Sequence, residues 1–131
     1  MSSPCPCGSG LAYGACCGAF HAGAAAPTAE ALMRSRFSAF ARRDAAYLMR
    51  TSHPSDRARA RPGDLRAAFA MEWTRLEVVG TARGGVDDAE GVVRFRAHWR
   101  QGEKTGVLEE TSRFSRDHGE WVYRDDRGVL P

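Results

Sequence analysis

The chain is short and nearly balanced in charge. It has 131 residues, of which 43% are hydrophobic and 27% charged, and its formal net charge at pH 7 is +3. This length suits one globular domain with a small appendage, since a chain of this size buries roughly two-thirds of the surface that its unfolded form exposes. The small net charge argues against a dedicated nucleic-acid-binding protein. No apolar run approaches the roughly 20 residues that span a bilayer, so we expect no membrane-spanning segment.

All the cysteines lie close to the N-terminus. Cys5 and Cys7 form one close pair, Cys16 and Cys17 form a second, and glycines separate and follow them. Two such pairs joined by a short loop can place four thiolates at the corners of a tetrahedron, roughly 2.3 Å from a Zn²⁺ ion. The glycines allow the tight turns that bring the pairs together. The sequence therefore predicts one zinc site, held by these four cysteines, in a module of residues 1–22.

Disulfide bonds are the alternative to zinc. A bond between the neighbours Cys16 and Cys17 would be strained, whereas crossed pairs such as Cys5 with Cys16 and Cys7 with Cys17 are geometrically feasible. Disulfides belong to oxidising compartments, and the N-terminus shows neither the basic nor the apolar region of a signal peptide. We therefore expect a cytoplasmic protein with reduced thiols. His21 is a further candidate ligand, although four thiolates already complete a closed site.

Small residues at 23–27 predict a linker between this module and a main domain of residues 28–131. Thr28 is a favourable N-cap, and Glu30 places an anion in the first turn of the helix that follows. Apolar residues then recur at steps of three and four, which predicts one buried helix face: Ala29, Leu32, Met33, Phe37, Phe40 and Ala41. Because the linker carries only small residues and a proline, we expect the two parts to unfold independently.

Two shorter helices are expected before any strand. Residues 45–50 form the first, which His53 and Pro54 end because proline disfavours helix at the residue before it. Residues 64–70 form the second, with Asp64 as its N-cap. Between these helices, arginines alternate with small residues: Arg57, Arg59 and Arg61. Three charges with no interleaved aromatic residue indicate a solvated loop rather than a phosphate contact.

From residue 71 the apolar pattern has a period of two, which predicts strands. The clearest strand runs over 90–100, and the turn at 101–105 joins it to an antiparallel partner at 106–116. A last strand is expected at 120–124. The outward face of the predicted sheet is expected to be polar, as in other antiparallel sheets that have one face in contact with water.

The register of the central hairpin decides which acidic residue faces inward. The simplest register places Glu109 and Arg113 on the same face as Phe95, whereas a one-residue bulge places Glu110 there instead. Both alternatives are compatible with the sequence.

Helices followed by a meander of antiparallel strands predict an α+β domain with the helices on one face of the sheet. The concave face of a curved sheet is where a small ligand would bind. Apolar side chains outnumber polar ones at the positions expected to face inward: Phe37, Phe40, Phe95, Trp99 and Trp121. Any pocket should therefore be small and mostly apolar.

Parts of the chain resemble known families. The run Cys-Pro-Cys-Gly-Ser-Gly at 5–10, followed by Cys-Cys-Gly at 16–18, resembles the SEC-C zinc motif. Segments spread over nearly the whole chain are similar to the YchJ family of bacterial proteins: Leu32 to Phe40, Asp44 to Leu48, Thr51 to Pro54, Lys104 to Gly106, Ser112 to Phe114 and Trp121 to Tyr123. The resemblance implies an N-terminal SEC-C motif joined to a domain similar to the nuclear-transport-factor-2 (NTF2) superfamily, whose curved sheet and helices enclose a cone-shaped cavity.

Four residues match the family's pattern and are expected at the borders of that cavity: Arg36, His53, Glu110 and Arg113. Each also has a structural interpretation. Arg36 would form a buried ion pair with Glu110 or Glu109 that fixes the helix against the sheet. His53 would be a satisfied helix-end residue, and Arg113 would pair across strands.

Two functions follow from these patterns. The first is an adaptor that binds another protein through the zinc module, since a closed zinc site has no catalytic vacancy. The second is a small-molecule binder, or an isomerase- or hydrolase-like enzyme, that uses the cone with His53 or a carboxylate as base. The sequence contains no nucleophile–base pair, phosphate loop or open metal site, so an enzyme assignment would rest on fold analogy alone.

Overall fold

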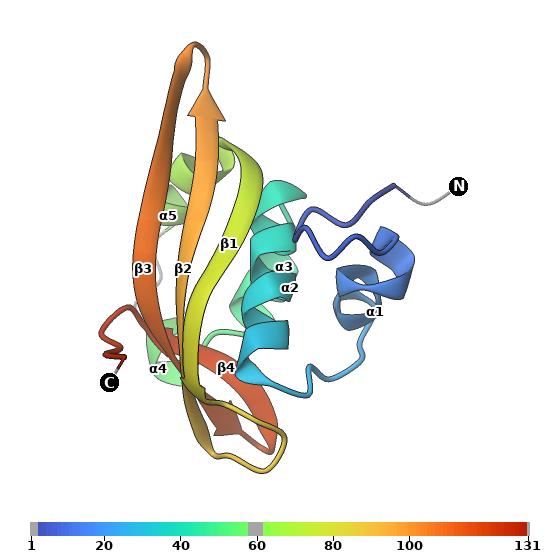
Figure 1. The fold of residues 1–131 in the computed structure, drawn as a ribbon, viewed down its shortest axis with the longest axis vertical. Coiled ribbons are helices and arrows are strands. Elements are labelled where there is room, and N and C mark those ends of the chain that lie inside the picture. Colours follow the sequence, from blue (N-terminus) through green and yellow to red (C-terminus); the bar gives the residue numbers. More distant parts are fainter. Residues whose placement is uncertain (1–2, 58–61, 131) are drawn as a thin grey trace.

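The computed structural model describes residues 3–57 and 62–130. A four-stranded sheet forms one layer, and the helices cover one of its faces (Figure 1). Two of the predicted loop arginines, Arg59 and Arg61, lie outside the described residues. Within the part of the chain that is described, no helix has the length and apolar character needed to cross a bilayer.

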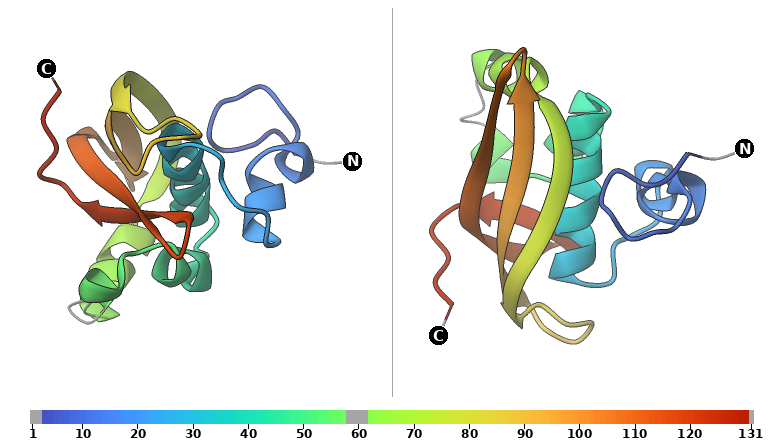
Figure 2. Two further views of the ribbon diagram at one scale, coloured as in Figure 1. Left: turned by 90° about the horizontal axis from the view of Figure 1, so that it is seen from below. Right: turned by 45° about the horizontal axis from the view of Figure 1, so that its top comes forward.

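The N-terminal segment packs on the longest helix. A short 3₁₀ helix, η1 (Tyr13–Ala15), and α1 (Cys17–His21) precede α2 (Ala29–Ala41). Helix α2 starts where the sequence predicts, because the Thr28 Oγ1 accepts a hydrogen bond from the Ala31 N–H at 3.0 Å. In both views of Figure 2, α2 lies between the sheet and the N-terminal segment.

Three short helices follow: α3 (Ala45–Arg50), α4 (Pro54–Arg57) and α5 (Pro62–Phe69). Helix α3 has the predicted bounds, and His53 and Pro54 follow its end, but Pro54 is also the first residue of α4. Proline is favoured at a first helical position, where its missing N–H has no intrahelical partner. The proposed cap of the next helix is wrong, because α5 begins at Pro62 and Asp64 lies inside it.

The strands form an antiparallel meander in the order β1-β2-β3-β4. They span β1 (Glu72–Arg83), β2 (Glu90–Gln101), β3 (Lys104–Asp117) and β4 (Glu120–Asp125). Strand β1 carries two register shifts in its pairing with β2, and such irregularities increase the local bend and twist of a strand.

The register of the β2–β3 hairpin brings Glu110 to the inner face. The turn has two residues, 102–103, and pairing continues from it without a bulge. Glu110 therefore lies opposite Phe95, on the face that packs against the helices. The simplest register predicted from the sequence is wrong by one residue, so Glu109 and Arg113 point to the outer face.

The main core lies between α2 and the inner face of the sheet. Its buried members from α2 are Ala29, Leu32, Met33 and Phe37, and those from the strands are Leu76, Val93, Phe95, Ala97, Phe114 and Trp121. Burying one large apolar side chain contributes about 1.5–3 kcal/mol, so this layer is a principal source of stability. The expected α+β architecture, with helices on one face of a curved antiparallel sheet, is confirmed.

Candidate functional site

The N-terminal segment folds into a tight loop that gathers the cysteines. Pro4 and Ala12 form an isolated antiparallel bridge, and the Cys5 N–H donates to the Leu11 carbonyl at 2.9 Å. Gly8 takes a φ of +80°, which lets the chain turn directly after the first cysteine pair. This loop returns the chain to η1 and α1, where the second cysteine pair lies.

The four sulfur atoms form one cluster. All lie within 4.8 Å of one another, and the Sγ atoms of Cys7 and Cys16 are 3.6 Å apart. Tetrahedral coordination at about 2.3 Å requires sulfurs about 3.8 Å apart, so the cluster is close to the geometry of a four-thiolate metal site. All four cysteines are free, so the crossed disulfides are not formed. The cluster could therefore bind a metal.

The thiols of Cys7, Cys16 and Cys17 are not electrostatically equivalent. A hydrogen bond with Cys17 lowers the pKa of Cys7 to about 4, against the opposing effect of burial. The same hydrogen bond, followed by burial, raises the pKa of Cys17, and burial raises that of Cys16. Among these three thiols the protein alone thus favours one thiolate, because further negative charges in a buried cluster repel each other. A bound cation removes this restriction, since coordinating thiols are deprotonated outright.

His21 is not part of the cluster. Its Nε2 donates to the Ser35 carbonyl at 2.8 Å, and its Nδ1 lies 2.5 Å from the Tyr13 hydroxyl, which donates to it. The ring also packs against Tyr47, with ring centroids 4.4 Å apart. Nε2 therefore joins the N-terminal segment to α2, and Nδ1 is occupied within the segment itself. The suggestion that His21 replaces a thiolate is wrong.

Other contacts hold the cluster against the same helix. Arg34 donates to the Cys7 carbonyl at 3.1 Å, and the Cys5 Sγ lies 3.5 Å from the Ser38 hydroxyl. The guanidinium of Arg42 stacks over the Tyr13 ring at 3.8 Å from its centroid. This packing argues against the expectation that the N-terminal module and the main domain unfold independently.

A pocket of about 210 Å³ opens on the other side of α2. Most of its lining is apolar and comes from α2 and the sheet: Met33, Phe37, Phe40, Trp73, Phe95 and Leu108. The polar lining residues are Arg36, Glu110, Ser112 and Tyr123. Leu108 is 43% exposed, which places it at the mouth of the pocket.

Glu110 is the carboxyl group of this pocket. The Ser112 hydroxyl donates to its Oε2 at 2.5 Å. Burial raises the pKa of Glu110, and the hydrogen bonds from Ser112 and Tyr123, with the charge of Arg36, oppose part of this rise. A carboxyl group with a raised pKa in an apolar pocket remains protonated to a higher pH than an exposed one, and in that form it can donate a hydrogen bond as well as accept one.

Arg36 is held mainly by the helical layer. It is only 8% exposed, and one terminal nitrogen donates to the Leu48 carbonyl at 3.0 Å and to the Thr51 hydroxyl at 2.7 Å. Its guanidinium also stacks on Tyr123, 4.7 Å from the ring centroid. Arg36 therefore joins α2, α3 and β4, and it acts on Glu110 as a nearby charge.

His53 and Arg113 do not line the pocket, contrary to the sequence-based prediction. The His53 N–H donates to the Tyr123 carbonyl at 2.8 Å, and its Nδ1 lies 2.7 Å from the Ser55 hydroxyl, as expected for a satisfied helix-end residue. Arg113 lies on the outer face and forms a two-point ion pair with Asp125. The family pattern placed them at the cavity, but the hairpin register and the start of α4 direct them elsewhere.

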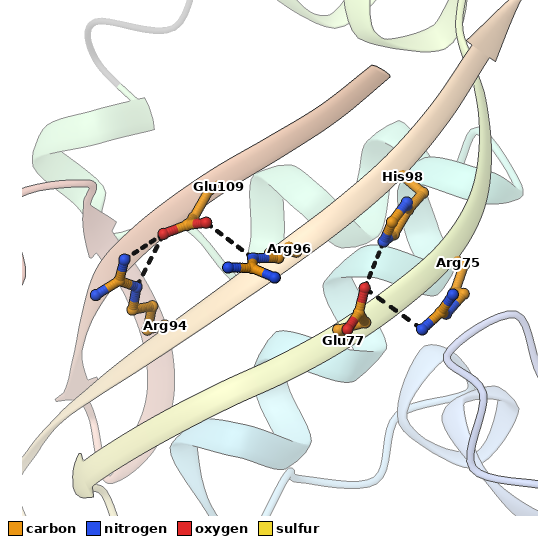
Figure 3. A network of polar contacts seen from close by, with 6 residues as sticks. All are labelled: Arg75, Glu77, Arg94, Arg96, His98 and Glu109. Carbon is orange, nitrogen blue, oxygen red and sulfur yellow. Dashed lines mark hydrogen bonds and ion pairs between the residues drawn. The ribbon is translucent and has the colours of Figure 1, made fainter. Parts of the chain in front are cut away.

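The outer face of the sheet is covered by charge networks (Figure 3). Glu109 accepts hydrogen bonds from Arg94 and from Arg96, the latter at 2.8 Å. Glu77 accepts from His98 Nε2 at 2.6 Å on the same face. Glu109 is thus engaged outside, which excludes it as the partner of Arg36.

These features agree with comparisons to known proteins. Residues 28–126 match the family described as the YchJ middle NTF2-like domain, and residues 1–19 match the SEC-C motif. The chain belongs to the YchJ family. It is 53% identical to a UPF0225 protein of Streptomyces coelicolor over 93% of both chains. It is also 46% identical to a UPF0225 protein of Corynebacterium glutamicum, covering 94% of this chain and 95% of that one.

Two experimental structures share the fold. A SEC-C motif containing protein from Rhodopseudomonas palustris, solved in solution, has a TM-score of 0.85 and 32% identity, covering 99% of this chain and 100% of that one. A crystal structure of a sec-c motif containing protein from Psychrobacter arcticus has a TM-score of 0.80, covering 100% of this chain and 84% of that one. At 24% identity the second supports the fold alone.

Sequence reasoning missed several residues that shape the two sites. Ser112 shares the inner face with Glu110 because the two are separated by one residue on a strand, a relation that becomes useful only once the register is known. Ser35 and Ser38 are fully buried beneath the N-terminal segment. The sequence did contain an indication of this packing: small residues lie on the face of α2 opposite its apolar face, which is typical of a helix that packs on both sides.

The charge state of Glu110 gives a testable pH dependence. A raised folded-state pKa means that the contribution of this carboxyl group to stability is complete below its unfolded pKa and lost as pH rises through the folded pKa. We expect Glu110→Gln to melt at a higher temperature than the parent protein at pH 7, with the difference closing toward about pH 4.

Glu109→Gln is the matched control for thermal denaturation between these pH values. Hydrogen bonds from Arg94 and then Arg96 lower the pKa of Glu109, so any stability that it contributes is present above its unfolded pKa and lost on acidification. Glu109→Gln should therefore melt at a lower temperature than the parent protein at pH 7, the opposite of the change expected for Glu110→Gln. If Glu110→Gln is instead less stable than the parent at pH 7 and equal to it in acid, Glu110 is held ionised and the assigned pKa direction is wrong.

Proposed function

We propose that this chain is a zinc protein whose main domain binds a small, mostly apolar molecule. The observation that carries the binding role is the pocket of about 210 Å³, in which aromatic and aliphatic side chains surround a single polar end. Pockets of this composition bind ligands through apolar contact and use a few polar groups to fix orientation. Glu110, Ser112 and Tyr123 supply such groups.

Zinc is the metal that best suits the cysteine cluster. Four thiolates are soft ligands, and a closed tetrahedral arrangement without a vacant position is typical of structural zinc sites. The ion would fix the loop of residues 5–17 against α2 rather than carry out chemistry.

Elemental analysis of the purified protein tests the metal assignment. We expect one zinc per chain, with loss of the metal in Cys7→Ser because a central buried ligand is removed. Ser3→Ala, at an exposed position that leaves all four thiolates in place, is the control and should retain the metal. Less than about half an equivalent of tightly held zinc, together with four thiols that react under native conditions, would contradict the assignment.

Binding in the pocket can be tested with 2-naphthol, a flat apolar molecule with one hydroxyl group. Trp73 lines the pocket, so binding should change its fluorescence. Ala68 lines the pocket from α5 and is half-buried, so Ala68→Leu should fill it with little disturbance of the core. We expect this variant to weaken binding on the order of tenfold, since overpacking costs about 1–3 kcal/mol.

Ala67→Leu provides the matched control, because Ala67 is the exposed neighbour on the same helix. It should bind 2-naphthol as the parent does. Equal binding by both variants, or no saturable fluorescence change in the parent, would show that the pocket is not a binding site.

A protein-docking role for the zinc module is the second candidate. One side of the module is occupied by α2, but Leu11 at the turn of the loop is 53% exposed. An exposed leucine on a metal-stiffened loop offers the kind of apolar contact that the buried centre of a protein interface uses. Leu11→Ser should then weaken recovery of a specific partner, whereas Val107→Ser, at an exposed position on the sheet, should not.

A further inference from the structure

A second hollow, of about 300 Å³, lies where the C-terminal tail crosses the sheet. The tail follows β4 and is fixed on β3, because the Gly128 N–H donates to the Thr111 carbonyl at 2.9 Å. The next residue, Val129, forms one wall of the hollow. Arginines from three strands form much of the rest: Arg83, Arg113 and Arg124.

The arginines of the strands fall into two groups. Those outside the hollow are engaged by carboxylates or by backbone carbonyls: Arg75, Arg94, Arg96, Arg100 and Arg116 (Figure 3 shows three of them). Inside the hollow, Arg113 is paired with Asp125. Within the described residues, Arg83 and Arg124 have no side-chain hydrogen bond or ion pair. The unneutralised guanidinium groups of the sheet thus gather at one place.

Two further features of the hollow indicate a binding site. Ser115 is one of the lining residues, and its hydroxyl is the buried side-chain polar group without a hydrogen-bond partner in the described part of the chain. Arg83 has a φ of +52°, a left-handed backbone conformation that is unfavourable for a residue with a Cβ atom. Strained backbone and unsatisfied buried polar groups both concentrate at functional sites.

We propose that this hollow binds a small organic oxyanion through the guanidinium groups of Arg83 and Arg124. The planar guanidinium fork matches two oxygens of a phosphate or carboxylate group and holds them by charge-assisted hydrogen bonds. Val92 and Val129 offer apolar surface for the carbon skeleton. Glu90 is the acidic residue among those that line the hollow, and it can accept hydrogen bonds from hydroxyl groups of the ligand.

Glycerol 2-phosphate is a suitable probe, because it carries an oxyanion and two hydroxyl groups. In a titration followed by ¹H–¹⁵N NMR at constant ionic strength, we expect saturable shifts of backbone amides around the hollow. Arg83→Gln and Arg124→Gln should each weaken binding about tenfold, the effect of one lost charge-assisted hydrogen bond. A parallel titration with acetate separates the two oxyanion classes. Tighter binding of glycerol 2-phosphate would show that the hollow prefers phosphorylated ligands, and equal binding would show that it accepts carboxylates as well.

Arg75→Gln is the matched control. Arg75 lies on the same sheet and is paired with Glu77, outside the hollow, so its replacement should leave binding unchanged. Both variants at the hollow remove exposed or half-buried side chains and should melt as the parent does. The proposal is overturned if Arg75→Gln weakens binding as much as Arg83→Gln, which would indicate general charge attraction, or if neither anion gives saturable shifts.

Discussion

The two-sided packing of α2 is the constraint on which the rest of the structure depends. One face of this helix buries Leu32, Met33 and Phe37 against the sheet. The other face carries Ser35 and Ser38, which are small enough for the N-terminal module to approach the helix closely. The apolar pocket and the cysteine cluster therefore lie on opposite sides of one helix. A change in how the N-terminal module packs on α2 affects the helix that also lines the pocket, and the reverse holds as well.

This arrangement gives the cysteine cluster a structural role that a freely attached module would lack. A helix of α1's length is marginal in isolation, and most helical stability in proteins comes from tertiary packing. His21 supplies that packing through hydrogen bonds to both Tyr13 and the α2 backbone. A metal held by the cluster would fix the loop that carries these contacts, and so would stabilise the main domain as well as the loop.

Much of this could be predicted from the sequence, because local rules determined it. The Thr28 cap, the apolar face of α2 and the period-two strands all follow from chain-local chemistry, and the cysteine spacing predicted the cluster. The hairpin register could not be predicted, because a turn of two residues rather than three reverses the face of every residue on β3. That single difference brought Glu110 into the pocket and put Arg113 outside. The docking of the module also escaped prediction, since small serines give no apolar signal.

Calorimetry of the intact protein with and without a metal chelator tests the central claim most directly. If α2 joins the metal module and the main domain into one cooperative unit, a single transition should move to lower temperature when the metal is removed. A main transition at unchanged temperature, beside the separate loss of a small N-terminal unit, would show that the two parts are independent and would contradict the account.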